Sequence, residues 1–537
     1  MCARGRGGVR ARPRGSSALP GPNAAQRLGL PPLWSSVTRR AVQRVLIANR
    51  GEIALRIARG CRALGLSPIA VYSEADRSAP HVLAADAAVC VGPAPARESY
   101  LNADALLAAA RTTKADAVHP GYGFFSENAA FAEAVERAGL RWIGPPPPAI
   151  ATMGDKLGAR ATVAKVGVPL VPGAEIAAGD PEAALRAARS LGYPILVKAA
   201  AGGGGKGMRT VASEGELAAA LEGASREATA AFADGRVYLE KLIVRPRHVE
   251  VQVLGDRHGT LVHLGERECS IQRRHQKIVE ETPCPIMTDA LRARMTEAAL
   301  AAAQAVDYSS AGTVEFLLDD QGGFYFLEMN TRLQVEHPVT ELVWGVDLVV
   351  AQLRVAAGER LGFTQADLRP RGHAVEVRLY AEDPQQGFFP SPGMVLAWHE
   401  PAGPGVRVDA AVRAGVGVPV EYDPMLAKLS AWGADRAQAI ARLVGALEET
   451  VILGPTTNLA FLRDVLGHAA FADGATHTSF LGDHLPAWKP GGTPDVAAAL
   501  AALATTRPAA GRGGDGAGPR SEPSPWETLG RWRLGGT

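Results

Sequence analysis

Two glutamates in the middle of the chain are spaced so that they could hold a cation between them. The segment TVEFLLDDQGGFYFLEMN contains two strand-like runs joined by a Gly-containing turn, which predicts a β-hairpin. If Gln321 and Gly322 form the loop, Glu315 lies opposite Glu328. Directly opposed like charges destabilise a sheet unless a cation lies between them. Because carboxylate oxygens suit magnesium, the hairpin predicts a magnesium site.

The residues that follow this hairpin extend its polar face. With a period of two, an extended chain places one set of polar side chains together: Glu328, Asn330, Arg332, Gln334 and Glu336. Apolar residues, including Leu333 and Val335, point the other way. A solvent-facing edge strand is the alternative reading, but the apolar opposite face favours a lined cleft.

A glycine-rich loop, AGGGGKGM at 201–208, follows the strand-like run YPILVK. Its backbone N–H groups could close over phosphates without obstruction by side chains. The usual P-loop pattern is absent, because Lys206 is followed by Gly207 and not by a hydroxyl residue. A flexible hinge is the alternative, and Lys156 and Lys198 are candidates for charges that neutralise phosphates.

A third cluster, SIQRRHQKIVEE, concentrates hydrogen-bond donors that could bind an anion: Gln272, Arg273, Arg274, His275 and Lys277. A nucleic-acid patch is the rival interpretation. It lacks the accompanying basic surface and the stacking aromatic residues, so a small anion is favoured.

The elements around these residues predict a multidomain α/β and α+β fold. The run VLIA, the turn NRGE, a helical pattern over 53–64 and the run PIAVYS form a βαβ unit, so 42–150 is expected to be a doubly wound α/β domain. The turn NRGE lacks G-x-G-x-x-G, and no nucleotide is assigned to it. Residues 151–358 form the expected catalytic domain, and 372–486 an α+β domain.

Both ends of the chain differ from the rest. Residues 1–41 carry eight arginines and no Asp or Glu, which fits a mitochondrial transit peptide or, favoured here, an over-extended translation start. Residues 487–537 are rich in Ala, Gly, Pro and Ser and are interpreted as a linker. Neither segment is expected to bury a core.

Bulk composition sets limits on function. The 537 residues are 47% hydrophobic and 21% charged, with a net charge of +2, which argues against nucleic acid or an anionic membrane as the main partner. Five cysteines form no C-x-x-C pair, which favours a reducing compartment. No run of about 20 apolar residues occurs, so a soluble protein is expected.

Taken together, the glycine-rich loop, the motif R-R-H-Q-K and the motif E-M-N-T-R-x-Q-V-E-H-P resemble the ATP-grasp enzymes called biotin carboxylases. The resemblance covers 44–485 and includes VLIANRGEIA, HPGYGFFSEN, PRHVEVQ, GHAVEVRLYAEDP and YDPMLAKL. It implies a three-part fold with a lid over about 172–242. A different ATP-grasp ligase would not need R-R-H-Q-K or Arg378.

The resemblance also implies roles for individual residues. ATP is expected to contact Lys156, Lys198, Gly204, Gly205, Glu240, Lys241, Leu242, Ile243, His248, Gln272, His275, Glu315 and Glu328. Two Mg²⁺ or Mn²⁺ sites are expected at Glu315, Glu328 and Asn330. Bicarbonate is expected at Lys277, Arg332 and the backbone N–H of Val335, with Glu336 as its base and Arg378 on the biotin oxygen. The catalytic set is therefore Lys277, Arg332, Glu336 and Arg378.

The absence of a biotin-attachment motif predicts a partner that carries the biotin. No M-K-M motif is present to carry biotin, so the biotin is expected on a carrier supplied in trans. Segments such as VGPAPARESYL and ATHTSFL look most similar to the α subunit of 3-methylcrotonyl-CoA carboxylase, and SPWETLGRWRLGGT looks like the start of its docking domain, cut short. An acetyl-CoA or propionyl-CoA carboxylase component, or an inactive truncated subunit, is the alternative.

The same resemblance implies a carboxyltransferase partner and a homodimer or larger hetero-oligomer. Neither nucleic acid nor membrane is expected as a partner. The bacterial cytoplasm is the favoured location, with the mitochondrial matrix as the alternative.

Overall fold

The computed structural model describes residues 42–176, 180–200, 208–232 and 234–491. The predicted phosphate-loop residues Gly204 and Gly205, the segment 1–41 and the segment 492–537 therefore lie outside the described residues. The described elements belong to a compact unit that ends at Pro490. Within the described ranges, no helix is both long and apolar enough to cross a bilayer.

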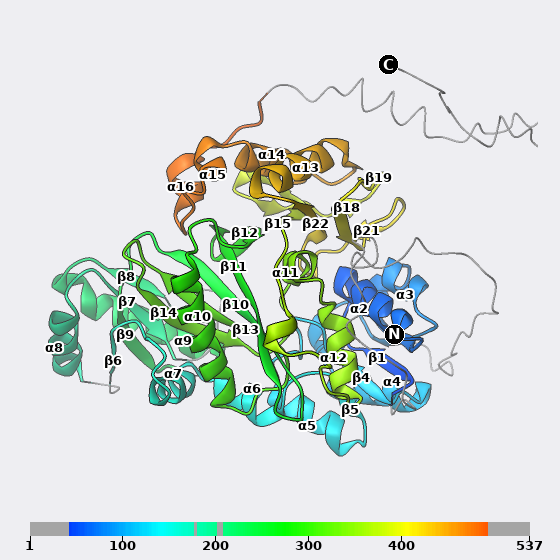
Figure 1. Cartoon of the computed structure of the whole chain (residues 1–537), viewed down its shortest axis with the longest axis horizontal. Coiled ribbons are helices and arrows are strands. Elements are labelled where there is room, and N and C mark those ends of the chain that lie inside the picture. The colour runs from blue at the N-terminus through cyan, green and yellow to red at the C-terminus, as the bar shows by residue number, and fades with distance from the viewer. Residues whose placement is uncertain (1–41, 177–179, 201–207, 233, 492–537) are drawn as a thin grey trace, which may run out of the picture. The chain divides into compact units, whose positions relative to one another are not determined.

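The N-terminal domain is the predicted doubly wound α/β domain (Figure 1). Its five strands are parallel and lie in the order β3-β2-β1-β4-β5. The strand order reverses between β1 and β4, which is where such sheets open a crevice. The elements are β1 (Arg44–Ile47), α2 (Gly51–Ala63), β2 (Ser67–Ser73), α3 (Pro80–Ala84), β3 (Ala87–Gly92), α4 (Ala103–Thr113), β4 (Ala117–His119), α5 (Ala129–Arg137) and β5 (Arg141–Trp142).

A smaller antiparallel sheet, in the order β6-β9-β7-β8, forms the region predicted as the lid. Apolar residues of its two helices, including Ala188 and Ala224, pack with Ile195 and Leu239 of the sheet into a separate core. Two helices precede the lid, α6 (Pro147–Gly154) and α7 (Lys156–Lys165). The lid itself consists of β6 (Gly173–Glu175), α8 (Pro181–Leu191), β7 (Ile195–Ala199), β8 (Arg209–Val211), α9 (Leu217–Phe232) and β9 (Val237–Lys241).

A single eight-stranded sheet, in the order β14-β13-β10-β11-β12-β15-β22-β20, joins the two regions predicted at 151–358 and 372–486. The junction is the antiparallel pair β12–β15, so the C-terminal region continues the sheet of the catalytic region. The strands are β10 (Arg247–Gly255), β11 (Leu261–Arg273), β12 (Gln276–Thr282), β13 (Ser310–Leu318), β14 (Phe324–Asn330), β15 (His373–Tyr380), β20 (Val406–Ala410) and β22 (Met425–Gly433).

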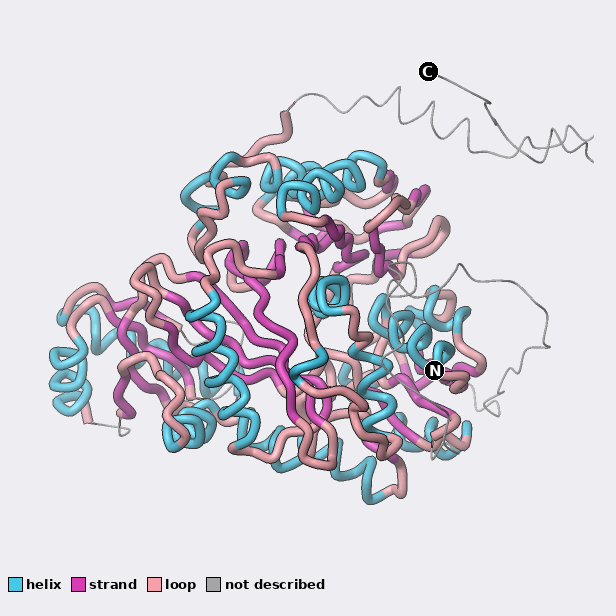
Figure 2. The backbone as a smooth tube through the Cα atoms, in the orientation of Figure 1, coloured by secondary structure: helices cyan, strands magenta, loops and turns pink. Residues whose placement is uncertain are grey.

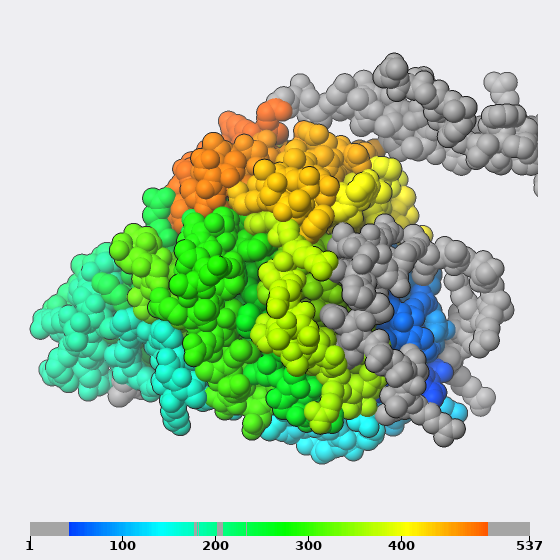
Figure 3. All heavy atoms as spheres, in the orientation of Figure 1, coloured from blue at the N-terminus to red at the C-terminus, as the bar shows by residue number. Residues whose placement is uncertain are grey.

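Helices cover this sheet, as the tube view shows (Figure 2). Methionine and alanine side chains of α10 pack on β10 and β13, in one core with Val251 and Phe316. In the space-filling view, the C-terminal residues in yellow and orange lie directly on the green residues of the catalytic region (Figure 3). The helices are α10 (Asp289–Gln304), α11 (His337–Trp344), α12 (Leu348–Ala356), α13 (Arg436–Glu449), α14 (Leu459–Leu466), α15 (Ala469–Ala472) and α16 (Phe480–His484).

Short strands complete the C-terminal region as pairs β16–β17, β18–β21 and β19–β23. Their bounds are β16 (Glu382–Asp383), β17 (Phe389–Pro390), β18 (Gly393–Met394), β19 (Ala397–His399), β21 (Gly417–Val418) and β23 (Val451–Leu453).

The β13–β14 hairpin differs from the predicted one in its turn. The backbone of Asp319 bonds to that of Gly323, so the loop holds three residues and not the two expected. That change alone would move Glu315 away from Glu328. A β-bulge between Glu315 and Phe316 inserts one extra residue in β14 and restores the pairing of Glu315 with Glu328. The predicted pairing is therefore observed, although its predicted cause was wrong.

Candidate active site

One cavity of about 910 Å³ brings the predicted site residues together. It lies between the lid sheet, the large sheet and the segment that follows β14. The described residues to which the resemblance assigned roles all line it: Lys156, Lys198, Glu240, Lys241, Leu242, Ile243, His248, Gln272, His275, Lys277, Glu315, Glu328, Asn330, Arg332, Val335, Glu336 and Arg378. In the predicted anion-binding cluster, Arg274 lines the cavity too, but Arg273 does not and instead contacts Glu382 at 2.8 Å.

A row of charged residues crosses four neighbouring strands, and two members of the row, Glu315 and Glu328, line the cavity. Glu328 pairs with Glu315, Glu315 with Glu250, and Glu250 with Arg267. Like charges that face each other in this way need cations nearby. The row explains why the neighbouring side chains are cationic or donate hydrogen bonds.

Lys277 supplies the central cation of this row. Its ammonium contacts Glu250, Glu315 at 2.9 Å and Glu336 at 2.7 Å. Burial opposes the charged ammonium, but the three carboxylates together hold the pKa of Lys277 well above its usual value. Arg267 neutralises Glu250 from the other side, with Nε 2.6 Å from the carboxylate. Two buried cations thus balance the inner part of the row.

Three further side chains also hold Glu315. His248 Nε2 lies 2.7 Å from Glu315 Oε2, and the amides of Asn330 and Gln334 donate to Oε1 at 2.8 and 3.0 Å. Gln272 in turn lies 2.7 Å from Nδ1 of His248. Glu315 is therefore fixed in place by four side chains, Lys277 included.

Glu328, at the end of the row, is the position where a magnesium ion fits. Among the described residues, none donates a hydrogen bond to its carboxylate. Burial and then the neighbouring Glu315 raise the pKa of Glu328 above its ordinary value. A divalent cation beside Glu328 and Glu315 would remove this repulsion with the hard oxygen ligands that it prefers. The third predicted ligand, Asn330, accepts at Oδ1 from Arg332 at 2.8 Å, so that oxygen is engaged in this structure.

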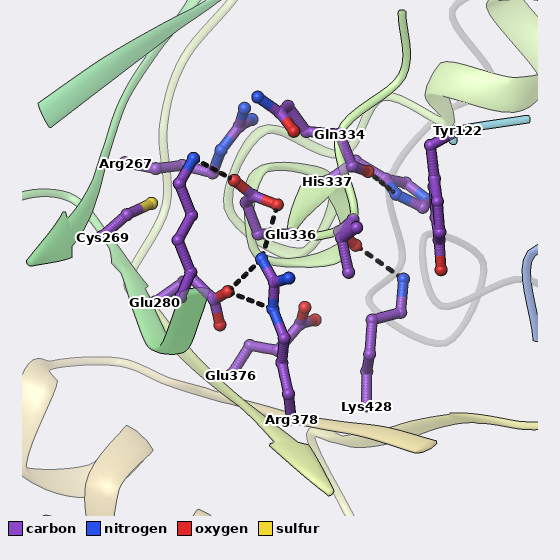
Figure 4. Close-up of polar contacts among 12 residues, drawn as sticks. Tyr122, Arg267, Cys269, Glu280, Gln334, Glu336, His337, Glu376, Arg378 and Lys428 are labelled. Atoms are coloured by element: carbon purple, nitrogen blue, oxygen red, sulfur yellow. Dashed lines mark hydrogen bonds and ion pairs between the residues drawn. The ribbon is translucent and has the colours of Figure 1, made fainter. Parts of the chain in front are cut away.

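Glu336 lines the cavity between two cations (Figure 4). One oxygen accepts from Lys277 and the other from Arg378 at 3.0 Å. Burial opposes ionisation, but Lys277 and Arg378 hold the pKa of Glu336 well below its ordinary value. Arg378 is itself held at 2.6 Å by Glu280 on the neighbouring strand β12. The predicted base and the predicted biotin residue are thus in direct contact.

The segment after β14 does not continue as a strand, contrary to the extended reading. Regular pairing ends at Asn330, and α11 begins at His337. Arg332 nevertheless points into the cavity, donating to Gln334 at 2.7 Å and to Glu127 at 3.0 Å. Short-range hydrogen bonds therefore keep the polar side chains on one side without a strand.

The opposite end of the cavity is built by the lid sheet and by the turn between β11 and β12. Lys198 on β7 lies 2.6 Å from Glu240 on β9, and Arg160 contacts the same carboxylate at 2.5 Å. Lys241 donates to the carbonyl oxygen of Gly192 at 2.6 Å. His275 occupies the β11–β12 turn with a φ of 66°. This end offers the cations and backbone groups that a nucleotide needs.

Several residues of the site were not predicted, namely Glu127, Arg160, Glu250, Arg267 and Glu280. The alternation in HVEVQ carried one usable signal, because it places Glu250 on the same face as His248. Arg267 and Glu280 gave no local signal. Their partners lie on strands that are distant in sequence.

Known proteins match the chain along the same ranges. Family models match residues 41–150 (biotin carboxylase, N-terminal domain), 155–364 (carbamoyl-phosphate synthase L chain, ATP binding domain) and 376–483 (biotin carboxylase C-terminal domain). The biotin carboxylase of Allochromatium vinosum is 51% identical over 441 residues, which cover 82% of this chain and 98% of that protein. The mitochondrial propionyl-CoA carboxylase alpha chain of Homo sapiens is 49% identical over 449 residues, or 83% and 62% of the two chains.

Solved structures agree. The biotin carboxylase–βγ-ATP complex from Campylobacter jejuni superposes with a TM-score of 0.80 at 45% identity, covering 82% of this chain and 99% of that one. The biotin carboxylase domain of Hydrogenobacter thermophilus 2-oxoglutarate carboxylase, with MgADP, ADP and bicarbonate, gives 0.81 at 43%, covering 85% and 100%. With its three matching domains and its near full-length relatives, this chain belongs to the biotin carboxylase family of enzymes.

Proposed function

We propose that this enzyme uses ATP and bicarbonate to carboxylate biotin, through carboxyphosphate. The observation that carries the proposal is the position of Lys277, whose ammonium joins the metal-side Glu315 to the buried Glu336 within one cavity. A single cation there could hold bicarbonate between its base and the phosphate to be transferred.

In the first step, Lys277, Arg332 and the backbone N–H of Val335 would hold bicarbonate while Glu336 takes its proton. The freed oxygen then attacks the γ-phosphorus of ATP and ADP leaves. In the free enzyme Glu336 is a weak base because Lys277 and Arg378 hold its pKa low. When these cations turn toward bicarbonate and biotin, the pKa of Glu336 rises toward a useful range.

The nucleotide would lie in the lid end of the cavity. Its adenine is assigned to 240–243. Other contacts to ATP are assigned to a set of cationic, polar and glycine residues: Lys156, Lys198, Gly204, Gly205, His248, Gln272 and His275. Glu315 and Glu328, with Asn330 nearby, would hold Mg²⁺, which neutralises phosphate charge when bound. We also propose that the chain is divided into three domains, at 42–150, 151–358 and 372–486, with the lid at about 172–242.

In the second step, Arg378 would stabilise the negative oxygen of the biotin ureido group. Carboxyphosphate breaks down to CO₂ and phosphate, and the phosphate takes the ureido proton. The ureido nitrogen then attacks CO₂ to give carboxybiotin. Arg378 is suited to this because it is buried, lies beside Glu336 and lines the same cavity.

We further propose that the biotin is carried in trans and that a carboxyltransferase subunit receives the carboxyl group. The segments VGPAPARESYL, YDPMLAKL and ATHTSFL support a 3-methylcrotonyl-CoA carboxylase assignment. A propionyl-CoA carboxylase component is the second candidate, because propionyl-CoA carboxylase alpha chains are among the relatives at 49–50% identity.

The test is phosphate release from ATP and Mg²⁺ by the purified chain, with and without bicarbonate and then with free biotin. Bicarbonate-dependent release that free biotin stimulates is the expected result. Phosphate release that does not depend on bicarbonate, or no phosphate release with all three substrates present, contradicts the proposal. Pairing the active chain with candidate carboxyltransferases and each acyl-CoA then decides the final acceptor.

A further inference from the structure

A buried lysine outside the predicted site contacts the backbone of the catalytic segment. Lys428 lies on β22, and its side chain is 0% exposed. Its ammonium donates to the carbonyl oxygen of Val335 at 2.6 Å (Figure 4). It also lies 3.2 Å from Glu52 on α2 and 5.9 Å from the ring centre of Tyr122. Lys428 thus connects the C-terminal region, the N-terminal domain and the catalytic segment.

The position is unfavourable for a lysine that serves only packing. An ammonium loses its hydration when it is buried, and a methionine of similar length would fill the space without that loss. Arg378, a second cation, lies directly opposite Lys428 in the β15–β22 ladder. The ammonium therefore has a cost that nearby carboxylates must offset, namely Glu52 and Asp409, which lies directly opposite Lys428 in the β20–β22 ladder.

The contact with Val335 lets the Lys428 ammonium orient the backbone of the catalytic segment. The Val335 carbonyl belongs to the same planar peptide unit as the N–H of Glu336, so holding the carbonyl fixes where the Glu336 side chain begins. The preceding carbonyl, that of Gln334, is held by Nδ1 of His337 at 2.8 Å. The two peptide units that flank Val335 are thus oriented by two different side chains, one local and one from a distant strand.

We propose that Lys428 is a positioning residue for the bicarbonate half-reaction, which fixes the Val335–Glu336 peptide and so aims the Glu336 carboxylate at bicarbonate. This inference rests on the proposed function. Lys428 touches none of the reacting atoms and acts through the backbone. Because Glu52 and Tyr122 lie at the crevice where the N-terminal sheet reverses, the contact also ties this alignment to the packing of the N-terminal domain.

The test compares Lys428→Met, Lys428→Arg and a matched control, Arg436→Met. Arg436 is another largely buried cation of the C-terminal region, but its hydrogen bonds go to Glu281 and to the carbonyl oxygens of Ala472 and Phe471 rather than to the catalytic segment. For each chain, bicarbonate-dependent ATP cleavage gives kcat and the KM values for bicarbonate and ATP, and thermal unfolding gives Tm.

In Lys428→Met, kcat/KM for bicarbonate should fall about 10- to 100-fold, as expected for a base displaced by a fraction of an ångström to one ångström. The KM for ATP should stay within about twofold, because the nucleotide end is built from other elements. Lys428→Arg, which keeps a cationic donor, should restore at least half of the lost activity on a logarithmic scale. Arg436→Met should lower Tm and leave both KM values within about twofold.

Three results overturn the inference. The first is an unchanged kcat/KM for bicarbonate in Lys428→Met. The second is a rise in the KM for ATP as large as the loss in kcat/KM for bicarbonate. The third is a Lys428→Arg chain as impaired as Lys428→Met. If Lys428→Met is not recovered folded, Lys428→Arg alone decides, since a loss beyond about tenfold with a normal KM for ATP contradicts positioning by a cation. A wild-type chain without bicarbonate-dependent cleavage would instead contradict the proposed function.

Discussion

At the scale of single residues, the site is a balance between carboxylates and buried cations. Glu250, Glu315 and Glu336 share one ammonium, that of Lys277, while Glu328 has no donor among the described residues. The proposed base accepts hydrogen bonds from two cations, whereas Glu328, one of the proposed metal ligands, accepts none from the described residues. Substitution of each should therefore have different consequences.

Replacing Glu336 by glutamine removes the base and keeps its shape. Glu336→Gln should lower the kcat of bicarbonate-dependent ATP cleavage by about 10² to 10⁴, as expected for loss of a general base. Nucleotide affinity should change little, because the lid end of the cavity lies apart from Glu336. Steady-state kinetics and ADP titration measure the two effects, and a normal kcat would refute the assignment.

Replacing Glu328 by glutamine tests the metal. Glu328→Gln should abolish bicarbonate-dependent ATP cleavage with the fold intact. The readout that does not depend on turnover is thermal unfolding with ADP. Added Mg²⁺ should raise the Tm of the wild type, since a ligand bound to the folded state stabilises it, and should not raise that of the variant. Equal Mg²⁺-dependent shifts in the two chains would exclude Glu328 as a ligand.

At the scale of elements, the large sheet opposes two further carboxylates at the β12–β15 junction. Glu280 and Glu376 are directly paired, and one oxygen of each has no hydrogen-bond partner among the described residues. Burial raises the pKa of Glu280 to about 7, and burial raises that of Glu376 to about 8 against the opposing effect of Lys428. The pair therefore holds a proton near neutral pH.

This raised pKa makes stability depend on pH in a defined direction. Between the ordinary value of 4.5 and about 8, the folded chain keeps a proton on Glu376 that the unfolded chain releases, so stability falls as pH rises through this window. Glu376→Gln removes the dependence. The difference in Tm, variant minus wild type, should increase by a few degrees between about pH 5 and about pH 8.5. Glu448→Gln, at an exposed site, should show no such trend, and parallel profiles for Glu376→Gln and wild type would refute the explanation.

The elements also show what the sequence could predict. Alternation along one strand correctly grouped Glu328 with Asn330, because side-chain direction within an extended strand depends only on local geometry. The three-residue loop and the bulge of the β13–β14 hairpin were missed, since register depends on the partner strand. Arg267, Glu280 and Lys428 were missed for the same reason: their partners are 17 to 98 residues away.

At the scale of the whole described unit, the sequence predicted three successive domains but not how they are joined. The large sheet runs through two of them, and a buried ionic cluster attaches the third. Arg56 on α2 of the N-terminal domain contacts Glu341 on α11 at 2.8 Å and Asp347 at 2.6 Å. Glu341 also accepts from Arg407 on β20 at 2.7 Å. Helix α11 begins directly after Glu336, so this cluster holds the N-terminal domain against the helix that follows the proposed base.

Arg56→Met should therefore destabilise the protein strongly, because Glu341 and Asp347 lose a shared cation in a buried setting. Removing one partner of a buried ion pair costs about 3–5 kcal/mol. The matched control is Arg62→Met on the same helix, whose pair with Asp86 is exposed and should contribute no more than about 1 kcal/mol. Urea unfolding of both variants measures the difference. If the two substitutions shift the unfolding midpoint equally, the cluster does not hold the N-terminal domain, which then depends on its other contacts, such as the packing of α2 on α12 and the pair of Glu52 with Lys428.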